Sequence, residues 1–327
     1  MDLEEPLFSD ILLALLEGEI VQHLVQVILH RLPLPLAEIP VSLLCRLTLS
    51  GEAFVDQFVS SWHPGEASAY LSALLQSQET PTIAELLSLL GQVARASGQN
   101  LPFLTATLGG PGLSYQPLQQ ALDHHDKSVR AKACGLAGKL LGQGQGGDRL
   151  LEKVLERLWD DDPAVRGSAS FAAGNAAYRA GSAPQAQAAL VPALPRIVGL
   201  LDDPRPRTRR NAASALGNLG SGSGQLGRGL LRAGAPQHLL ELACRDSQAC
   251  VREAALAALR AMSQWPQVRE VLISLRSCEK LSVMCQRMEQ KATLSGTGSV
   301  VSPRSSAHTL LHHCNRLRDA LTPTLSD

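Results

Sequence analysis

Two short stretches of the chain match patterns known from binding sites. Residues 142–147 read GQGQGG and match G-x-G-x-x-G, a pattern in which backbone N–H groups cradle a phosphate. Such a cradle follows a strand and opens a helix, whereas the preceding GLAGKLL has the pattern of a helix. We therefore interpret residues 142–147 as a flexible loop and expect no cofactor.

The second stretch offers nitrogen and sulfur ligands close to the C-terminus. His308 and His312 are four residues apart on a predicted helix, and Cys314 is nearby, a spacing that could bind zinc. No second cluster completes four ligands, and the pair His124-His125 falls in a turn. We expect no metal, and no nucleophile, base or acid constellation indicates a catalytic site.

A cluster of arginines could bind negative charge. The densest basic group in the chain consists of Arg205, Arg207, Arg209 and Arg210. One interpretation is a solvated turn in which these arginines pair with Asp202, Asp203 and the aspartates at 160–162. The alternative is a docking patch for an acidic or phosphorylated partner.

The arginine cluster belongs to a repeated pattern that must position it. Four segments align on arginines separated by 36, 43 and 43 residues, namely Arg130, Arg166, Arg209 and Arg252. An aspartate lies six positions before each of the last three, and an alanine lies three positions after all four. The aspartate suits a turn where it caps the next helix, and the alanine lets helices of adjacent repeats approach closely. This period is typical of paired-helix solenoids.

The composition also favours stacked helices. Leu and Ala dominate the apolar residues, aromatic residues make up 3% of the chain, and the alternating runs that mark strands are missing. We therefore predict an all-α fold, a right-handed armadillo/HEAT-like superhelix.

Charge and cysteine usage restrict the class of protein. Lys+Arg and Asp+Glu both number 30, so the chain lacks the strongly basic balance expected of a nucleic-acid-binding protein. The 7 cysteines are scattered without a CxxC motif, as in a reduced cytosolic protein. Glu17 and Glu19 interrupt the first apolar run, so we expect no membrane insertion. We predict a soluble, cytoplasmic protein.

Residues 233–262, AGAPQHLLELACRDSQACVREAALAALRAM, resemble an armadillo repeat. In armadillo repeats an asparagine of the last helix hydrogen-bonds the backbone of an extended peptide, and Asn175 and Asn218 match that position. Phe171 stands where the family usually has a groove tryptophan. The alternative is that each amide satisfies the backbone of a neighbouring helix. The glycine before each asparagine would leave room for a helix or a bound chain.

A closer resemblance covers residues 115–285. The ordered motifs SASFAAGNAAYRAG, RRNAASALGNLG and EKLSVM are similar to the C-terminal region of the Fused family of serine/threonine kinases. In that family the region is a non-catalytic helical-repeat array that binds proteins. The chain contains no V-A-I-K, H-R-D or D-F-G motif, so the resemblance implies that a catalytic domain would lie outside these residues.

The Fused resemblance implies a scaffold whose partners are signalling or ciliary proteins, in Hedgehog signalling or motile cilium assembly. It implies a cytoplasmic location, with cilium or nucleus as alternatives. The alternative function is that of an armadillo-type adaptor or transport protein that binds a linear peptide.

We divide the chain into four parts. Residues 1–110 are degenerate helical repeats or an N-terminal cap, and residues 115–288 are armadillo/HEAT-like repeats. Residues 289–306 are polar and Gly/Ser-rich and are predicted to be a disordered linker, followed at 307–327 by a short helix and tail. Ser302, in Ser-Pro-Arg, is a candidate site for a proline-directed kinase, with an inert linker as the alternative.

Overall fold

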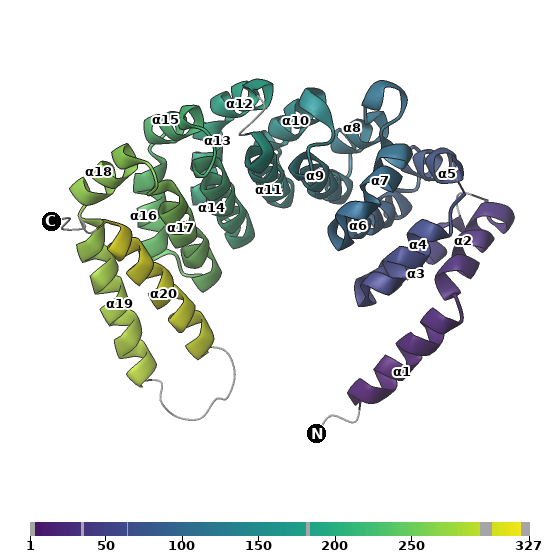
Figure 1. The fold of residues 1–327 in the computed structure, drawn as a ribbon, viewed down its shortest axis with the longest axis horizontal. Coiled ribbons are helices and arrows are strands. Elements are labelled where there is room, and N and C mark those ends of the chain that lie inside the picture. Colours follow the sequence, from purple (N-terminus) through teal and green to yellow (C-terminus); the bar gives the residue numbers. More distant parts are fainter. Residues whose placement is uncertain (1–3, 34–35, 64, 181–183, 295–302, 322–327) are drawn as a thin grey trace. The chain divides into compact units, whose positions relative to one another are not determined.

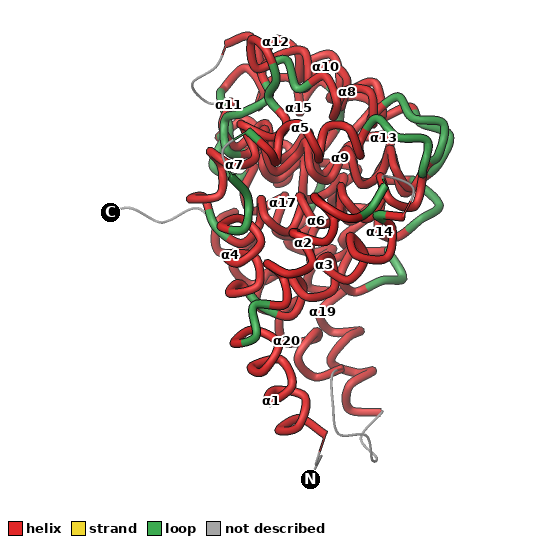
Figure 2. Tube along the Cα trace, turned by 90° about the vertical axis from the view of Figure 1, so that its right-hand side faces the viewer, coloured by secondary structure: helices red, strands yellow, loops and turns green. Residues whose placement is uncertain are grey.

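The computed structural model describes residues 4–33, 36–63, 65–180, 184–294 and 303–321. Every regular element in these ranges is a helix, so the predicted all-α class is confirmed (Figures 1 and 2). The chain divides into two compact units, Met1–Lys153 and Val154–Asp327. Each unit is a stack of helical repeats.

The first unit stacks helices whose sequences lack an aspartate six positions before an arginine, the spacing that marks the later repeats. Its helices are α1 (Glu4–Glu17), α2 (Ile20–Arg31), α3 (Glu38–Ser50), α4 (Glu52–Ser60), α5 (Glu66–Leu75), α6 (Thr80–Ala96), α7 (Leu101–Leu108), α8 (Gln116–Leu122) and α9 (Lys127–Gly142), while α10 (Gly147–Glu156) spans the boundary. Helix α6 packs between α3 and α9. It is apolar around much of its circumference, with Leu86, Leu90 and Val93 fully buried, because it has a neighbour on each side.

Among the described residues, no single helix has the length and apolar character needed to cross a membrane. Helices α1 and α2 meet that test only as a pair, by length and composition alone, and the pair is bent by 54°.

In the second unit, one long helix from each repeat packs against the next. Its helices are α11 (Pro163–Ala180), α12 (Pro184–Leu190), α13 (Leu194–Gly199), α14 (Pro206–Gly220), α15 (Gly224–Arg232), α16 (Ala235–Arg245), α17 (Ala249–Met262), α18 (Pro266–Ser274), α19 (Ser277–Leu294) and α20 (Pro303–Leu321). Helices α11, α14, α17 and α20 lie side by side in sequence order (Figure 1). The last three aligned sequence segments therefore correspond to α11, α14 and α17 and the turns before them, while the first, with Arg130, corresponds to α9 of the first unit.

The Gly-Asn pairs of α11 and α14 are explained by close helix packing. A Cβ atom on Gly174 would lie 2.7 Å from Cα of Ala215 in α14. A Cβ atom on Gly217 would lie 3.1 Å from Cα of Ala258 in α17. Each glycine thus faces the small residue of the next helix, which confirms the expectation that it leaves room for a neighbouring helix.

We expect Gly174→Ala to lower stability although alanine is the better helix former. Alanine gains about 1 kcal/mol in helix propensity, but overpacking a tight contact costs about 1–3 kcal/mol. Gly135→Ala in α9 is the matched control, because a Cβ atom there meets nothing within 4 Å. Thermal unfolding should show a lower melting temperature for Gly174→Ala and an unchanged or higher one for Gly135→Ala. Equal stabilisation by both changes would contradict the packing explanation.

The structure corrects the limits of the predicted linker. Helix α19 extends to Leu294 and α20 begins at Pro303, so both ends of the 289–306 segment are helical. The glycines of this segment are confined to 296–298, whereas Lys291, Ala292 and Leu294 are good helix formers, and proline is favoured at a helix start. Residues 295–302, including Ser302, lie outside the described residues.

Candidate functional site

Buried ion pairs connect the turns of successive repeats in the second unit. Arg166, at the start of α11, donates from Nε (2.8 Å) and Nη2 (2.6 Å) to Oδ2 of Asp203 in the following repeat. Arg209, at the start of α14, donates from Nε (2.7 Å) to Oδ2 and from Nη2 (3.1 Å) to Oδ1 of Asp246. The two aspartate side chains are only 2% and 3% exposed. We call these two pairs the Arg–Asp ladder.

The remaining nitrogen of each arginine binds its own turn. Nη1 of Arg209 donates to the carbonyl oxygen of Asp203 (3.0 Å), six residues earlier. Corresponding bonds to the residue six positions before are made by Arg130, Arg166 and Arg252. Each aspartate in turn accepts a backbone N–H two residues later, as Asp246 does from Gln248 (2.8 Å). The aligned columns therefore build the turn and also join it to the next repeat.

Arg209 forms its ion pair with the following repeat rather than within its own turn. Arg209 binds Asp246 of the following repeat, and Asp203 is bound by Arg166, so the ladder runs forward along the chain. Arg205, Arg207 and Arg210 are exposed. The hydrogen-bonded ion pair of Arg209 is thus with Asp246, because α14 turns this side chain toward the next repeat, while the carboxylates of Asp203 and Asp202 act on Arg209 only through weaker electrostatic attraction. Pairing of Arg205, Arg207 and Arg210 with Asp202, Asp203 and the aspartates at 160–162 stays a prediction. The docking-patch alternative concerns the three exposed arginines and stays a prediction.

In the Arg–Asp ladder, the arginine stays protonated and the aspartate stays ionised in the folded state. The hydrogen bond to Asp246 raises the pKa of the Arg209 guanidinium. Burial alone would raise the pKa of the Asp246 carboxyl, but the hydrogen bonds from Arg209 and from the Gln248 N–H outweigh burial, and this pKa lies below its usual value. The pair is therefore an internal crosslink rather than a flexible surface contact.

A second feature lies on the exposed side of α11 and α14. Phe171, Asn175 and Tyr178 recur at the spacing of one helix face, with Phe171 39% and Tyr178 76% exposed. Asn175 and Asn218, the equivalent residue of α14, are half-buried. We call Phe171, Asn175, Tyr178 and Asn218 the asparagine face.

The asparagine that binds a neighbouring helix is one that the sequence reasoning missed. Nδ2 of Asn211 donates to the carbonyl oxygen of Gly167 in α11 at 2.9 Å. In the described part of the chain, the side chains of Asn175 and Asn218 make no such hydrogen bond. Asn211 precedes Asn218 by two helical turns, and that spacing was the available signal. Peptide binding by Asn175 and Asn218 stays a prediction.

The other candidate residues lie apart from these two features. Residues 142–147 form the connection from α9 to α10, where Gly144, Gly146 and Gly147 have φ of 80°, 95° and 60°. In α20, His312 is exposed whereas Cys314 is buried, and the side chain of His308 lies outside the described set. Among the described residues, no group of three His, Cys, Asp or Glu side chains is placed to hold a metal ion. The His124 ring accepts the Asp126 N–H at 3.0 Å within its turn.

Lys139 stands in α9 where α11 has Asn175. Its Nζ donates to the carbonyl oxygen of Gly91 in α6, and burial, with a smaller contribution from Arg95, lowers its pKa to about 8. Because lysine in an unfolded chain titrates near pH 10.4, the unfolded state binds more protons between these values. We expect stability to rise as the pH increases from 8 to 10. Unfolding by urea at each pH should show this rise, and Lys139→Met should reduce it; an identical pH dependence in the variant would contradict the assignment.

Comparisons with known proteins agree with the repeat architecture. The model of HEAT repeats matches residues 151–260. Serine/threonine-protein kinase 36 of Pongo abelii and of Mus musculus are each 41% identical to this chain, over 100% of the chain and 24% of the relative. The chain thus spans about a quarter of the length of these relatives. The matched part contains helical repeats and no kinase catalytic domain is found in it.

Solved structures show the same fold. A designed armadillo repeat protein in complex with the peptide (KR)4 matches with a TM-score of 0.60 and 23% identity, over 74% of this chain and 99% of that protein. An engineered protein matches with a TM-score of 0.66 and 19% identity, over 92% of this chain and 68% of that protein. The fold is therefore an all-α solenoid of the armadillo/HEAT kind.

Proposed function

We propose that this chain is a non-catalytic helical-repeat scaffold that binds other proteins, as the C-terminal region of a Fused-type serine/threonine kinase would; its 41% identity to serine/threonine-protein kinase 36 and its HEAT repeats support this. One observation carries the proposal. Two adjacent repeats present half-buried asparagine amides, and these amides are not used by a neighbouring helix in the described chain. A partly buried amide retains hydrogen-bonding capacity that a peptide backbone can satisfy.

The asparagine face has the dimensions for an extended peptide. The axes of closely packed helices, such as α11 and α14, lie about 8–10 Å apart. An extended chain advances about 3.3 Å per residue. The two amides would therefore bind backbone groups about three residues apart on the peptide. Phe171 and Tyr178 supply exposed rings against which its side chains pack. The designed armadillo repeat protein in complex with the peptide (KR)4, which has the same fold, supports this mode of binding.

The partners that we propose are signalling or ciliary proteins, as the Fused resemblance implies, acting in Hedgehog signalling or in motile cilium assembly. An adaptor or transport protein that reads a long linear peptide is the second candidate. It is disfavoured because only two adjacent repeats carry the asparagine, with Lys139 and Ala261 at the flanking positions. A short recognition surface suits a scaffold that contacts a partner at several points.

A photo-crosslinking experiment tests the proposed surface. A benzoylphenylalanine replacing Phe171 should crosslink to a protein partner in extracts of ciliated cells, and a synthetic peptide spanning the crosslinked segment should then compete. The same group at Gln185, an exposed residue of α12, is the matched control and should not crosslink to that partner. Equal crosslinking at both positions, or failure of the peptide to compete, would argue against a binding surface on α11.

A further inference from the structure

The Arg–Asp ladder stops at Arg252, which has the local geometry of its predecessors but no aspartate. Nη1 of Arg252 donates to the carbonyl oxygen of Asp246 at 2.8 Å, as Arg209 does to that of Asp203. In the described chain, however, the buried Nε of Arg252 has no hydrogen-bond partner. The same nitrogen binds an aspartate in both preceding repeats. A buried, charged donor without an acceptor is costly, so this position is suited to receive one.

The missing aspartate has a cause in the sequence of the last repeat. Helices α16 and α19 both follow a residue in the left-handed conformation, Gly234 (φ 71°) and Arg276 (φ 54°). Twelve residues after Gly234 comes Asp246, just beyond the end of α16, whereas twelve residues after Arg276 comes Met288, within α19. The helix continues where the earlier repeat turns, and no carboxylate stands at that position.

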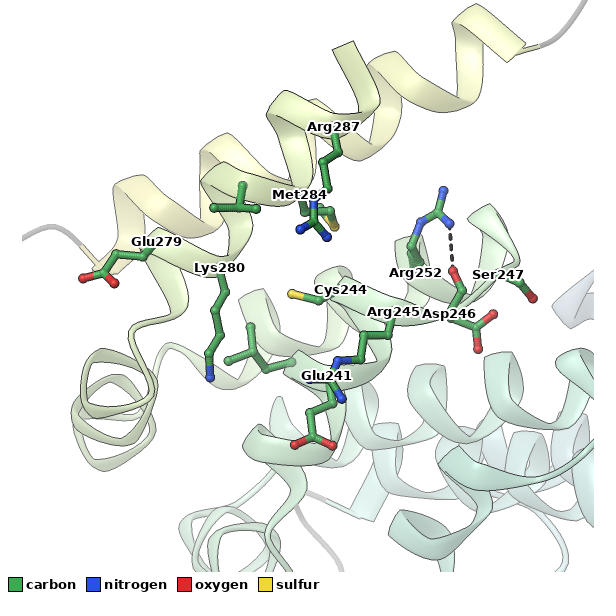
Figure 3. Close-up of a pocket in the computed structure, with 12 residues that line it drawn as sticks. Glu241, Cys244, Arg245, Asp246, Ser247, Arg252, Glu279, Lys280, Met284 and Arg287 are labelled. Atoms are coloured by element: carbon green, nitrogen blue, oxygen red, sulfur yellow. Dashed lines mark hydrogen bonds between the residues drawn. The ribbon is translucent and has the colours of Figure 1, made fainter. Parts of the chain in front are cut away.

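A pocket of about 830 Å³ opens beside Arg252, between α16, the start of α17 and α19 (Figure 3). Its basic lining residues are Arg245, Arg252, Lys280 and Arg287. Figure 3 shows Arg287 extending from α19 toward the space that Arg252 borders, while Glu279 points away from it. Val283 and Met284 add an apolar wall. The corresponding cleft one repeat earlier, bordered by Arg209 and Asp246, measures about 400 Å³.

The acidic residues of the pocket do not neutralise Arg252. The carboxylate of Asp246 is already bound by Arg209 and by the Gln248 N–H. Glu279 lies 3.9 Å from the exposed Arg276, and Glu241 is exposed. Arg252 therefore borders the pocket with an Nε that has no hydrogen-bond acceptor among the described residues, although its charge is attracted by the nearby Asp246 carboxylate.

We propose that this pocket receives an aspartate or glutamate side chain of a partner protein. The carboxylate would bind Nε and Nη2 of Arg252, as Asp203 binds Arg166 and Asp246 binds Arg209, with Arg287 contributing charge from α19. Two copies of this fork-to-carboxylate geometry within the chain define the ligand chemistry, and the apolar wall accommodates the residues beside the acid. This surface on α16, α17 and α19 is separate from the asparagine face.

Two matched peptides test the proposal by fluorescence anisotropy with the whole chain. One is a fluorescein-labelled peptide of three Ser-Ala-Asp-Leu repeats, and its twin has asparagine for each aspartate. We expect the aspartate peptide to bind at least about tenfold more tightly than the twin. Arg252→Gln and Arg287→Gln should each weaken binding of the aspartate peptide by about tenfold. Arg228→Gln on α15 and Arg46→Gln on α3, the same charge change at exposed arginines outside the pocket and outside the predicted docking patch, should alter it less than about twofold.

Arg287→Gln keeps the test valid if Arg252→Gln unfolds, since Arg287 is exposed and has no hydrogen bond to another described residue. Melting curves report the stability of each variant. Equal binding of the two peptides, no binding of either, or equal losses in all four arginine variants would overturn the proposal. Tighter binding of a phosphoserine version of the peptide, or of an oligonucleotide of equal charge, would also overturn it. A variant with both Asn175→Ala and Asn218→Ala should bind the aspartate peptide normally, which separates this site from the asparagine face.

Discussion

Arg209→Ala is expected to destabilise the second unit by about 3–5 kcal/mol, because it leaves the buried carboxylate of Asp246 without its partner. Chemical denaturation followed by circular dichroism gives the size of the effect, and hydrogen exchange of α14 and α17 amides gives its location. Arg207→Ala, an exposed arginine of the same helix, should change stability by less than about 0.5 kcal/mol. Similar losses in the two variants would show that the ladder has no special role.

The same pair has a defined pH dependence. Because the folded state lowers the pKa of Asp246, its contribution to stability is fully present above the unfolded value, near 3.9, and is lost as the pH falls through the folded value. The stability difference between wild type and Arg209→Ala should therefore shrink in acid. A double variant, Arg209→Met with Asp246→Leu, should recover much of the stability at neutral pH, since an apolar pair replaces a buried ion pair at little cost.

Replacing both Asn175 and Asn218 with alanine is expected to weaken binding of the partner by about 1–3 kcal/mol, because two amide contacts to a peptide backbone are removed. The melting temperature should change little, since alanine is the better helix former and neither amide binds another described side chain or backbone group. Calorimetry with the crosslinked partner peptide and thermal unfolding of the same samples measure the two effects.

Asn211→Ala is the matched control for the asparagine pair, because its amide donates to Gly167 across helices. This variant should lose stability by about 0.5–1.5 kcal/mol and retain partner binding. If the Asn175 and Asn218 double variant instead melted many degrees lower with a proportionate loss of binding, the amides would be structural and the peptide surface would be wrong.

Much of the fold could be predicted because the same residue types recur at the same positions in several repeats. The arginine and aspartate columns identify the turn before each long helix, and the structure joins them in ion pairs. The alanine column identifies the packed face of the helix, and Ala169, Ala212 and Ala255 are fully buried. The direction of pairing could not be predicted in the same way. Arg209 is closer in sequence to Asp203 than to Asp246, and only the packing of α14 against α17 brings the distant aspartate within reach.

The candidate sites show the same limit. Composition placed a disordered linker over 289–306, but helix formation depends on where the glycines lie within that segment rather than on their number. The sequence does show why Arg252 lacks an aspartate partner: Met288 occupies the position in the last repeat that Asp246 occupies in the repeat before it. This correspondence appears only when α16 and α19 are aligned on Gly234 and Arg276, the left-handed residues that precede them. The sequence alone does not show that Arg276 has this conformation.

Because each arginine of the Arg–Asp ladder pairs with an aspartate of the following repeat, truncating the row of repeats from its two ends leaves different unpaired charges. Ending a fragment after residue 232 would remove Asp246 and leave Arg209 as an exposed, always charged guanidinium that water can solvate. Starting a fragment at residue 184 would remove Arg166 and leave Asp203, a carboxylate that can bind a proton instead. Fragments trimmed from the N-terminal side should therefore gain stability in mild acid, whereas those trimmed from the C-terminal side should not.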